Sequence, residues 1–214
     1  MRSKSYFCEM RSNLSKITFF ISISIFLLCN SCRTNSAKSD ASQSNLKTRY
    51  LILIRHAKSN KDSLSMTLAD FDRPLDSSGF LDAHKMNKFL LSQQDFIGFE
   101  KIIYSPALRT TQTYIELTKN SSWSSVGVPN SDLYRSTIEN YLAVVKKSTH
   151  SISSLGHIGH NPTITELANR LQSDKFFDEV PTGAVLLIKF QLKSWQEIET
   201  AKGKLILFKS PKGI

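Results

Sequence analysis

The stretch Tyr50-Leu51-Ile52-Leu53-Ile54-Arg55-His56-Ala57-Lys58-Ser59 joins a continuous apolar run to a charged and polar segment. A short apolar run without polar alternation is typical of a central strand that is buried on both faces of a sheet. In open α/β sheets, ligands bind beyond the carboxyl ends of the strands. Arg55 and His56 follow this strand directly, so the sequence places a guanidinium and an imidazole where a ligand would bind.

Strand and helix patterns alternate along the rest of the chain. This order predicts an α/β fold with three layers, in which a mostly parallel central sheet carries helices on both faces. Ser136 and Glu139 have the spacing of a capping box at the start of one helix. The expected strands cover residues 50–54, 101–104, 151–155, 184–190 and 205–208, and the expected helices cover residues 79–93, 106–118, 136–147 and 162–171.

A second strand end carries another basic residue, within residues 104–111 (YSPALRTT). Ser105 suits the N-cap of the following helix, and Pro106 suits its first position. This places Arg109 in the first turn or so, near the free backbone N–H groups that favour anions.

A third strand end, residues 159–163 (GHNPT), has the same design, with Asn161 as N-cap and His160 just outside the helix. Three junctions of one sheet could therefore direct Arg55, His56, Arg109 and His160 at one spot. His157 also follows a glycine and is a rival for His160 at this spot, but the Asn-Pro pair that suits a helix start follows His160. The HxxH spacing of the two histidines lacks a third ligand, so we expect no metal.

These pieces resemble the histidine phosphatase superfamily, which is also called phosphoglycerate mutase-like, and within it the SixA-like phosphohistidine phosphatase branch. The four pieces occur in the order of the family and lie between Tyr50 and Phe190. They are residues 53–59 (LIRHAKS), 72–75 (DRPL) followed by Gly79, 105–110 (SPALRT) and 159–162 (GHNP).

The resemblance implies an enzyme in which His56 takes up a phosphoryl group and water then hydrolyses the phosphohistidine. Arg55 and Arg109 would hold the phosphoryl oxygens with forked N–H donors. His160 would donate a further hydrogen bond or a positive charge, and Arg73 would add a phosphate contact. No metal or cofactor is needed, because the arginines supply the countercharge. The substrate would be a phosphorylated small molecule or a phosphohistidine protein.

Arg73 also has a purely structural interpretation, as the partner of Asp72 or Asp76 in a surface ion pair. The alternative for the whole protein is a non-catalytic lipoprotein of the same fold that binds a phosphate ligand and does not hydrolyse it. Because all four pocket residues are present, the sequence favours the enzyme.

The chain departs from the family in its acidic residues. Many relatives carry a glutamate acid/base where this chain has residues 133–135 (LYR), and acid phosphatases carry an aspartate where it has Asn161. Without a positioned acid, we expect a preference for groups that leave easily. If an acid exists, Asp62, Asp132 and Glu139 are the first candidates.

The N-terminal residues predict where the protein is located in the cell. Residues 1–31 have a polar, basic start and a short apolar run at 17–28 (ITFFISISIFLL), as a secretory signal does. Their end resembles a bacterial lipoprotein cleavage box before Cys32, the expected lipidation site. Residues 32–48 are rich in Ser, Asn and Lys and are expected to form a flexible tether to a domain over 49–214. The protein would then be a membrane-anchored, extracytoplasmic lipoprotein, or cytoplasmic if the leader is not a signal.

The formal net charge of +10 suits anionic partners such as phosphates and acidic lipid headgroups. The chain has no Lys/Arg-rich run and no interleaved basic and aromatic residues, so we expect no nucleic-acid partner. All three cysteines lie at or before Cys32, which excludes a disulfide-stapled domain.

Overall fold

The computed structural model describes residues 45–60 and 69–214 of the chain. The expected signal peptide, the lipidation site Cys32 and most of the expected tether lie outside these residues, as does Asp62. Within the described part of the chain, no helix has the length and apolar character needed to cross a membrane.

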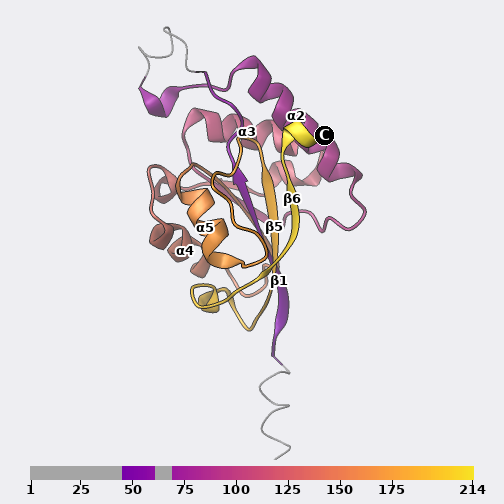
Figure 1. Ribbon diagram of the computed structural model, residues 1–214, viewed down its shortest axis with the longest axis vertical. Helices are drawn as coiled ribbons and strands as arrows, with labels where there is room; N and C mark the ends of the chain where they lie inside the picture. Colours follow the sequence, from indigo (N-terminus) through magenta and orange to yellow (C-terminus); the bar gives the residue numbers. More distant parts are fainter. Residues whose placement is uncertain (1–44, 61–68) are drawn as a thin grey trace, which may run out of the picture. The chain divides into compact units, whose positions relative to one another are not determined.

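A six-stranded sheet with strand order β3-β2-β4-β1-β5-β6 forms the centre of the part of the chain that the structure describes. Figure 1 labels β1, β5 and β6 of this sheet. The pairings β3–β2, β2–β4 and β4–β1 are parallel, whereas β5 is antiparallel to both β1 and β6. The expected mostly parallel sheet is confirmed. The strands are β1 (Lys47–Arg55), β2 (Lys101–Tyr104), β3 (Gly127–Pro129), β4 (Ser154–Gly159), β5 (Val185–Leu192) and β6 (Lys204–Lys209).

Helices cover both faces of the sheet, which gives the three layers expected from the sequence. The α-helices are α2 (Ser77–Ser92), α3 (Leu108–Thr118), α4 (Ile138–Lys146) and α5 (Thr163–Leu171). Short 3-10 helices connect them: η2 (Asp70–Asp72), η3 (Ser122–Ser125), η4 (Ser131–Leu133), η5 (Trp195–Glu197) and η6 (Pro211–Gly213).

The apolar run of β1 separates two hydrophobic cores. Leu51 and Leu53 pack in one core with residues of α4 and α5, and Ile52 and Ile54 pack in the other with residues of α2 and α3. All four side chains are fully buried. Burial of such a side chain stabilises the fold by about 1.5–3 kcal/mol. Because β1 packs on both cores, the strand that ends at the site also connects the two hydrophobic cores.

β1 begins earlier in the chain than the sequence indicated, at Lys47. Residues 47 and 48, assigned to the tether, pair with Leu192 and Gln191 of β5. The next residue, Arg49, is fully buried. Its guanidinium donates to the backbone carbonyls of Ile152, His150 and Lys193 at 2.6, 3.1 and 3.2 Å. This arginine therefore anchors the end of β1 opposite the site.

Two local predictions were wrong. The helix expected at 136–147 is not capped by Ser136 and Glu139, because the N-cap lies one residue later, at Thr137, whose Oγ1 accepts the Asn140 N–H at 3.4 Å. The strand expected at 151–155 is β4, three residues further on, and it contains Gly156. A Cβ there would lie 2.8 Å from the Phe99 ring, so this glycine lets an aromatic ring pack against the strand.

Candidate active site

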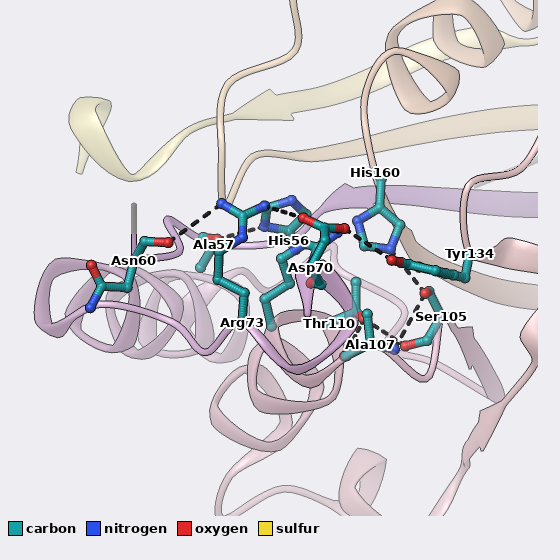
Figure 2. Close-up of polar contacts among 11 residues, drawn as sticks. His56, Ala57, Asn60, Asp70, Arg73, Ser105, Ala107, Thr110, Tyr134 and His160 are labelled. Atoms are coloured by element: carbon teal, nitrogen blue, oxygen red, sulfur yellow. Dashed lines mark hydrogen bonds and ion pairs between the residues drawn. The ribbon is translucent and has the colours of Figure 1, made fainter. Parts of the chain in front are cut away.

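The carboxyl ends of three neighbouring parallel strands, β1, β4 and β2, open into one pocket. Arg55 ends β1, His160 follows β4, and Arg109 lies in the helix after β2. These three residues line the pocket together with His56 and Arg73. The structure thus brings together all five residues that the sequence assigned to phosphate binding or catalysis, and Figure 2 shows part of this cluster.

His56 has a defined tautomer. Its Nδ1 lies 2.7 Å from the backbone carbonyl of Ala57. A carbonyl oxygen only accepts hydrogen bonds, so Nδ1 carries the proton and Nε2 keeps its lone pair. Burial lowers the pKa of His56 to about 3, helped by the nearby His160, Arg109 and Arg55. The ring is therefore a neutral imidazole whose Nε2 is unprotonated.

The loop that carries His56 is held from two sides. The Ala57 N–H donates to Thr113 Oγ1 of α3 at 3.0 Å, and that hydroxyl donates to the Arg109 carbonyl at 2.6 Å. On the other side, α2 packs directly on the loop, because a Cβ on Gly79 would lie 2.0 Å from the Lys58 carbonyl oxygen. Only a residue without a side chain fits there, which gives the glycine after the DRPL piece a physical role.

Arg109 is almost completely buried and pairs with a residue that the sequence did not suggest, Asp70. Arg109 Nη1 donates to the Asp70 backbone carbonyl at 2.5 Å, and Nη2 donates to Asp70 Oδ2 at 3.1 Å. Tyr134 Oη donates to the same carboxyl oxygen at 3.0 Å. Burial by itself raises the pKa of Asp70, but Arg109, Tyr134 and Arg73 outweigh it and lower the pKa to about 2.

Arg73 contacts the same carboxylate. Its Nη2 donates to Asp70 Oδ1 at 2.9 Å, and its Nη1 reaches the Asn60 carbonyl at 3.4 Å. The expected surface pairs of Arg73 with Asp72 or Asp76 are therefore wrong. Asp76 instead pairs with Lys58 at 3.2 Å and accepts the first-turn N–H of Gly79 in α2.

Arg55 lies at the rim of the pocket. Its Nη1 donates to Glu179 Oε1 at 2.6 Å and to the Val180 carbonyl at 2.7 Å. Asn161 donates to the same carbonyl at 3.1 Å and does not cap α5, contrary to the expectation. These contacts fasten the loop before β5 to the end of β1. Arg55 Nε is buried and has no partner in the described part of the chain.

His160 faces His56, with the ring centroids 5.2 Å apart. Its Nε2 lies 2.9 Å from Ser105 Oγ. Ser105 therefore positions this histidine and does not cap α3, whose N-cap position is Ala107 and has no side-chain cap. Burial and the charge of Arg109 lower the pKa of His160 to about 4.

His157, the rival for the second histidine, lies elsewhere. It is fully buried in β4, with its ring 5.8 Å from that of Tyr141. Neither of its ring nitrogens has a hydrogen-bond partner among the described residues. Burial lowers its pKa to about 3, so it is a neutral core residue.

Comparison with known proteins supports this picture. No protein-family model matches the chain. An uncharacterized chloroplast protein from Arabidopsis thaliana is 33% identical over 191 residues, which covers 81% of this chain and 83% of the relative. The structure of the protein histidine phosphatase SixA complexed with tungstate superposes with a TM-score of 0.64 at 20% identity, covering 77% of this chain and 98% of that one.

Two further solved structures share the fold. The putative phosphohistidine phosphatase SixA from Agrobacterium tumefaciens gives a TM-score of 0.63 at 23% identity and covers 76% of this chain and 98% of that one. Phosphoglycerate mutase from Bacillus anthracis gives 0.51 at 15% identity and covers 72% and 96%. These likenesses show that the chain has the histidine phosphatase fold. Its fold is that of the SixA-like branch, whose structures superpose with higher TM-scores than the mutase does.

The two acid candidates that the structure describes, Glu139 and Asp132, are both exposed. Glu139 lines the pocket, but its side chain is 71% exposed and lies 3.7 Å from Arg170. Asp132 is exposed in η4, and Asp62 lies outside the described residues. Asp70, three residues before Arg73, also lines the pocket, and its carboxylate pairs with Arg73 and Arg109. The i, i+3 spacing of an acid and a base could have drawn attention to it, but that pattern is common on surfaces.

A titration of the protein tests the assignment of His56. Because the folded pKa values of His56 and His160 are lowered, both rings should stay neutral as the pH falls to about 5, well below the ordinary histidine pKa of about 6.5. Nitrogen-15 NMR of labelled imidazoles should show the Nδ1–H tautomer for His56, assigned by loss of the signal in His56→Ala. An imidazolium spectrum for His56 at neutral pH contradicts the geometry.

Proposed function

We propose that the protein is a metal-independent phosphatase that hydrolyses a phosphate monoester or a phosphoramidate through a phosphohistidine intermediate on His56. The observation that carries the proposal is the state of this imidazole. Its Nδ1 is hydrogen-bonded to the Ala57 carbonyl, so its unprotonated Nε2 belongs to a neutral ring, and Arg55, Arg73 and Arg109 line the same pocket. A neutral imidazole nitrogen is a nucleophile, and arginines stabilise phosphoryl oxygens.

The reaction proceeds in two displacements. In the first, the lone pair of His56 Nε2 forms a bond to phosphorus, and the leaving group departs with the electron pair of its own bond. In the second, the oxygen of a water molecule forms a bond to the same phosphorus, the P–N bond breaks, and its electron pair returns to Nε2. The released phosphate keeps one proton of that water, and the other proton passes to solvent. Both transfers mainly need in-line positioning and charge stabilisation, which Arg55, Arg109 and Arg73 supply.

His160 assists the same centre. Its ring lies beside that of His56, and its Nε2 is held near Ser105 Oγ. Its Nδ1 is buried and has no partner among the described residues, so this ring has one nitrogen that can interact with a bound group. We assign to it a hydrogen bond to a phosphoryl oxygen.

The substrate class follows from the leaving group. Asp70 has a strongly lowered pKa and is ionised at neutral pH, so its carboxylate has no proton to give to the leaving group. The enzyme therefore suits phosphohistidine, acyl phosphates or activated esters, whose leaving groups need little protonation. The names of the SixA structures, as phosphohistidine phosphatases, agree with the first of these.

The alternative is a phosphate-binding protein of the same fold without turnover. The same arginines would hold the ligand in that case. The two functions differ in one respect, since only the enzyme uses His56 as a nucleophile.

Hydrolysis of an aryl phosphate in the presence of a metal chelator separates them. The protein should turn the ester over, and His56→Ala should abolish the activity. Arg109→Lys should lower kcat/KM by about 10²–10³-fold, because an ammonium cannot reproduce two directed N–H donors. His150→Ala and Arg170→Lys, at exposed or partly exposed positions outside the pocket, are the matched controls and should keep the parent rate. Chelator-resistant turnover by His56→Ala contradicts the proposal.

We further propose that the domain is tethered to a membrane through a lipid on Cys32 and faces away from the cytoplasm. The apolar run at 17–28 and the polar residues after Cys32 support this address. Such an address favours a small phosphorylated molecule as substrate, because phosphorelay proteins are cytoplasmic. A cytoplasmic enzyme could instead act on a phosphohistidine protein.

Metabolic labelling with a fatty acid tests the anchor. The full chain should incorporate the label and fractionate with membranes, whereas Cys32→Ser should lose the label. Cys29→Ser, three residues earlier, is the control and should retain it. A soluble, unlabelled full-length protein contradicts the anchor.

A further inference from the structure

The carboxylate of Asp70 is bound as a ligand would be. Arg73 donates to one of its oxygens at 2.9 Å, and Arg109 and Tyr134 donate to the other at 3.1 and 3.0 Å. Figure 2 shows Asp70 between Arg73 and Tyr134, close to His160 and in front of His56. An anion of this chain therefore lies among the side chains of the pocket.

The donors that hold Asp70 are the donors that a phosphoryl group needs. Arg73 and Arg109 are two of the three arginines assigned to phosphate, and a carboxylate presents to a guanidinium the same pair of acceptor oxygens as a phosphoryl group does. A phosphoryl group on the same donors would also bring its negative charge against the ionised Asp70. Both anions cannot use these N–H groups at once.

We propose that Asp70 is an internal competitor that occupies the Arg73–Arg109 part of the phosphate site and is displaced by the substrate phosphoryl group. This inference rests on the proposed function, since it concerns the anion site of that enzyme. Asp70 thereby determines which ligands bind: an anion must interact with the two arginines more strongly than the carboxylate does.

The exposure of the two side chains supports displacement of the aspartate. The side chain of Arg109 is 6% exposed, whereas that of Asp70 is 35% exposed. Asp70 begins the three-residue helix η2, so its carboxylate can turn toward water while the guanidinium stays in the pocket. Arg109 also retains a buried Nε without a partner in the described part of the chain, which leaves a donor for the incoming group.

Before a ligand binds, the ion pair between Asp70 and Arg109 also stabilises the buried guanidinium. A buried guanidinium without a counterion is strongly unfavourable. Asp70 provides the counterion for Arg109 until a ligand arrives, and the ligand then takes over this role. The site can therefore keep a buried arginine in place without a permanent partner that blocks phosphate.

Binding of inorganic phosphate to the full-length protein, measured by calorimetry, tests the proposal. Asp70→Asn keeps the shape of the side chain and removes its charge. Phosphate should then bind about tenfold more tightly, as expected if Asp70 occupies the site in roughly nine of ten free molecules. Asp72→Asn is the matched control, because it removes an exposed charge from the same short helix, and Asp72 has no ion pair with any residue that the structure describes. Its effect should be much smaller.

Two results overturn the proposal. If Asp70→Asn binds phosphate more weakly than the parent while its thermal unfolding is unchanged, Asp70 positions the arginines and does not compete with the ligand. If Asp72→Asn tightens binding as much as Asp70→Asn does, the effect comes from net charge and not from the contact. Neither measurement depends on turnover, so failure of the proposed catalysis is seen separately, as a protein that binds phosphate and hydrolyses no ester.

Discussion

The parallel pairing of β1 with β4 is the constraint on which the site depends. It aligns Arg55 with Gly159 and continues one residue beyond, where the His56 N–H donates to the Gly159 carbonyl at 3.0 Å. Because the two strands end at the same level, the residues that follow them, His56 and His160, lie with their rings in contact. A shift of this register by one residue would move His56 to the other face of the sheet and separate the two histidines.

The electrostatics of the pocket follow from burying many donors in one place. Burial and positive neighbours keep both imidazoles neutral, which preserves the nucleophile, while the guanidinium groups of Arg73 and Arg109 stay charged and need a counterion. Asp70 supplies that counterion, and its strongly lowered pKa is the consequence. On this account Arg73 and Arg109 always face an anion. That anion is the Asp70 carboxylate before the substrate binds and the phosphoryl group afterwards.

Much of this could be predicted from the sequence, because the governing signals are local. The apolar run before Arg55 identifies a central strand, and the polar residues after each strand mark the edge where ligands bind. The pairing of Asp70 with Arg109 has no such signal, since the two residues are far apart in the sequence and meet only when η2 folds over α3. The role of Ser105 was misjudged for a related reason: a serine before a proline suits a helix cap, and only the fold shows His160 beside its hydroxyl.

The central claim is that His56 carries the phosphoryl group, and trapping the intermediate tests it most directly. Brief exposure of the protein to a phosphorus-32 aryl phosphate, followed by alkaline denaturation, should leave an acid-labile label that peptide mapping places on His56. The label should be absent from His56→Ala. Label that persists in this variant, or that maps to a serine or an aspartate, contradicts the account.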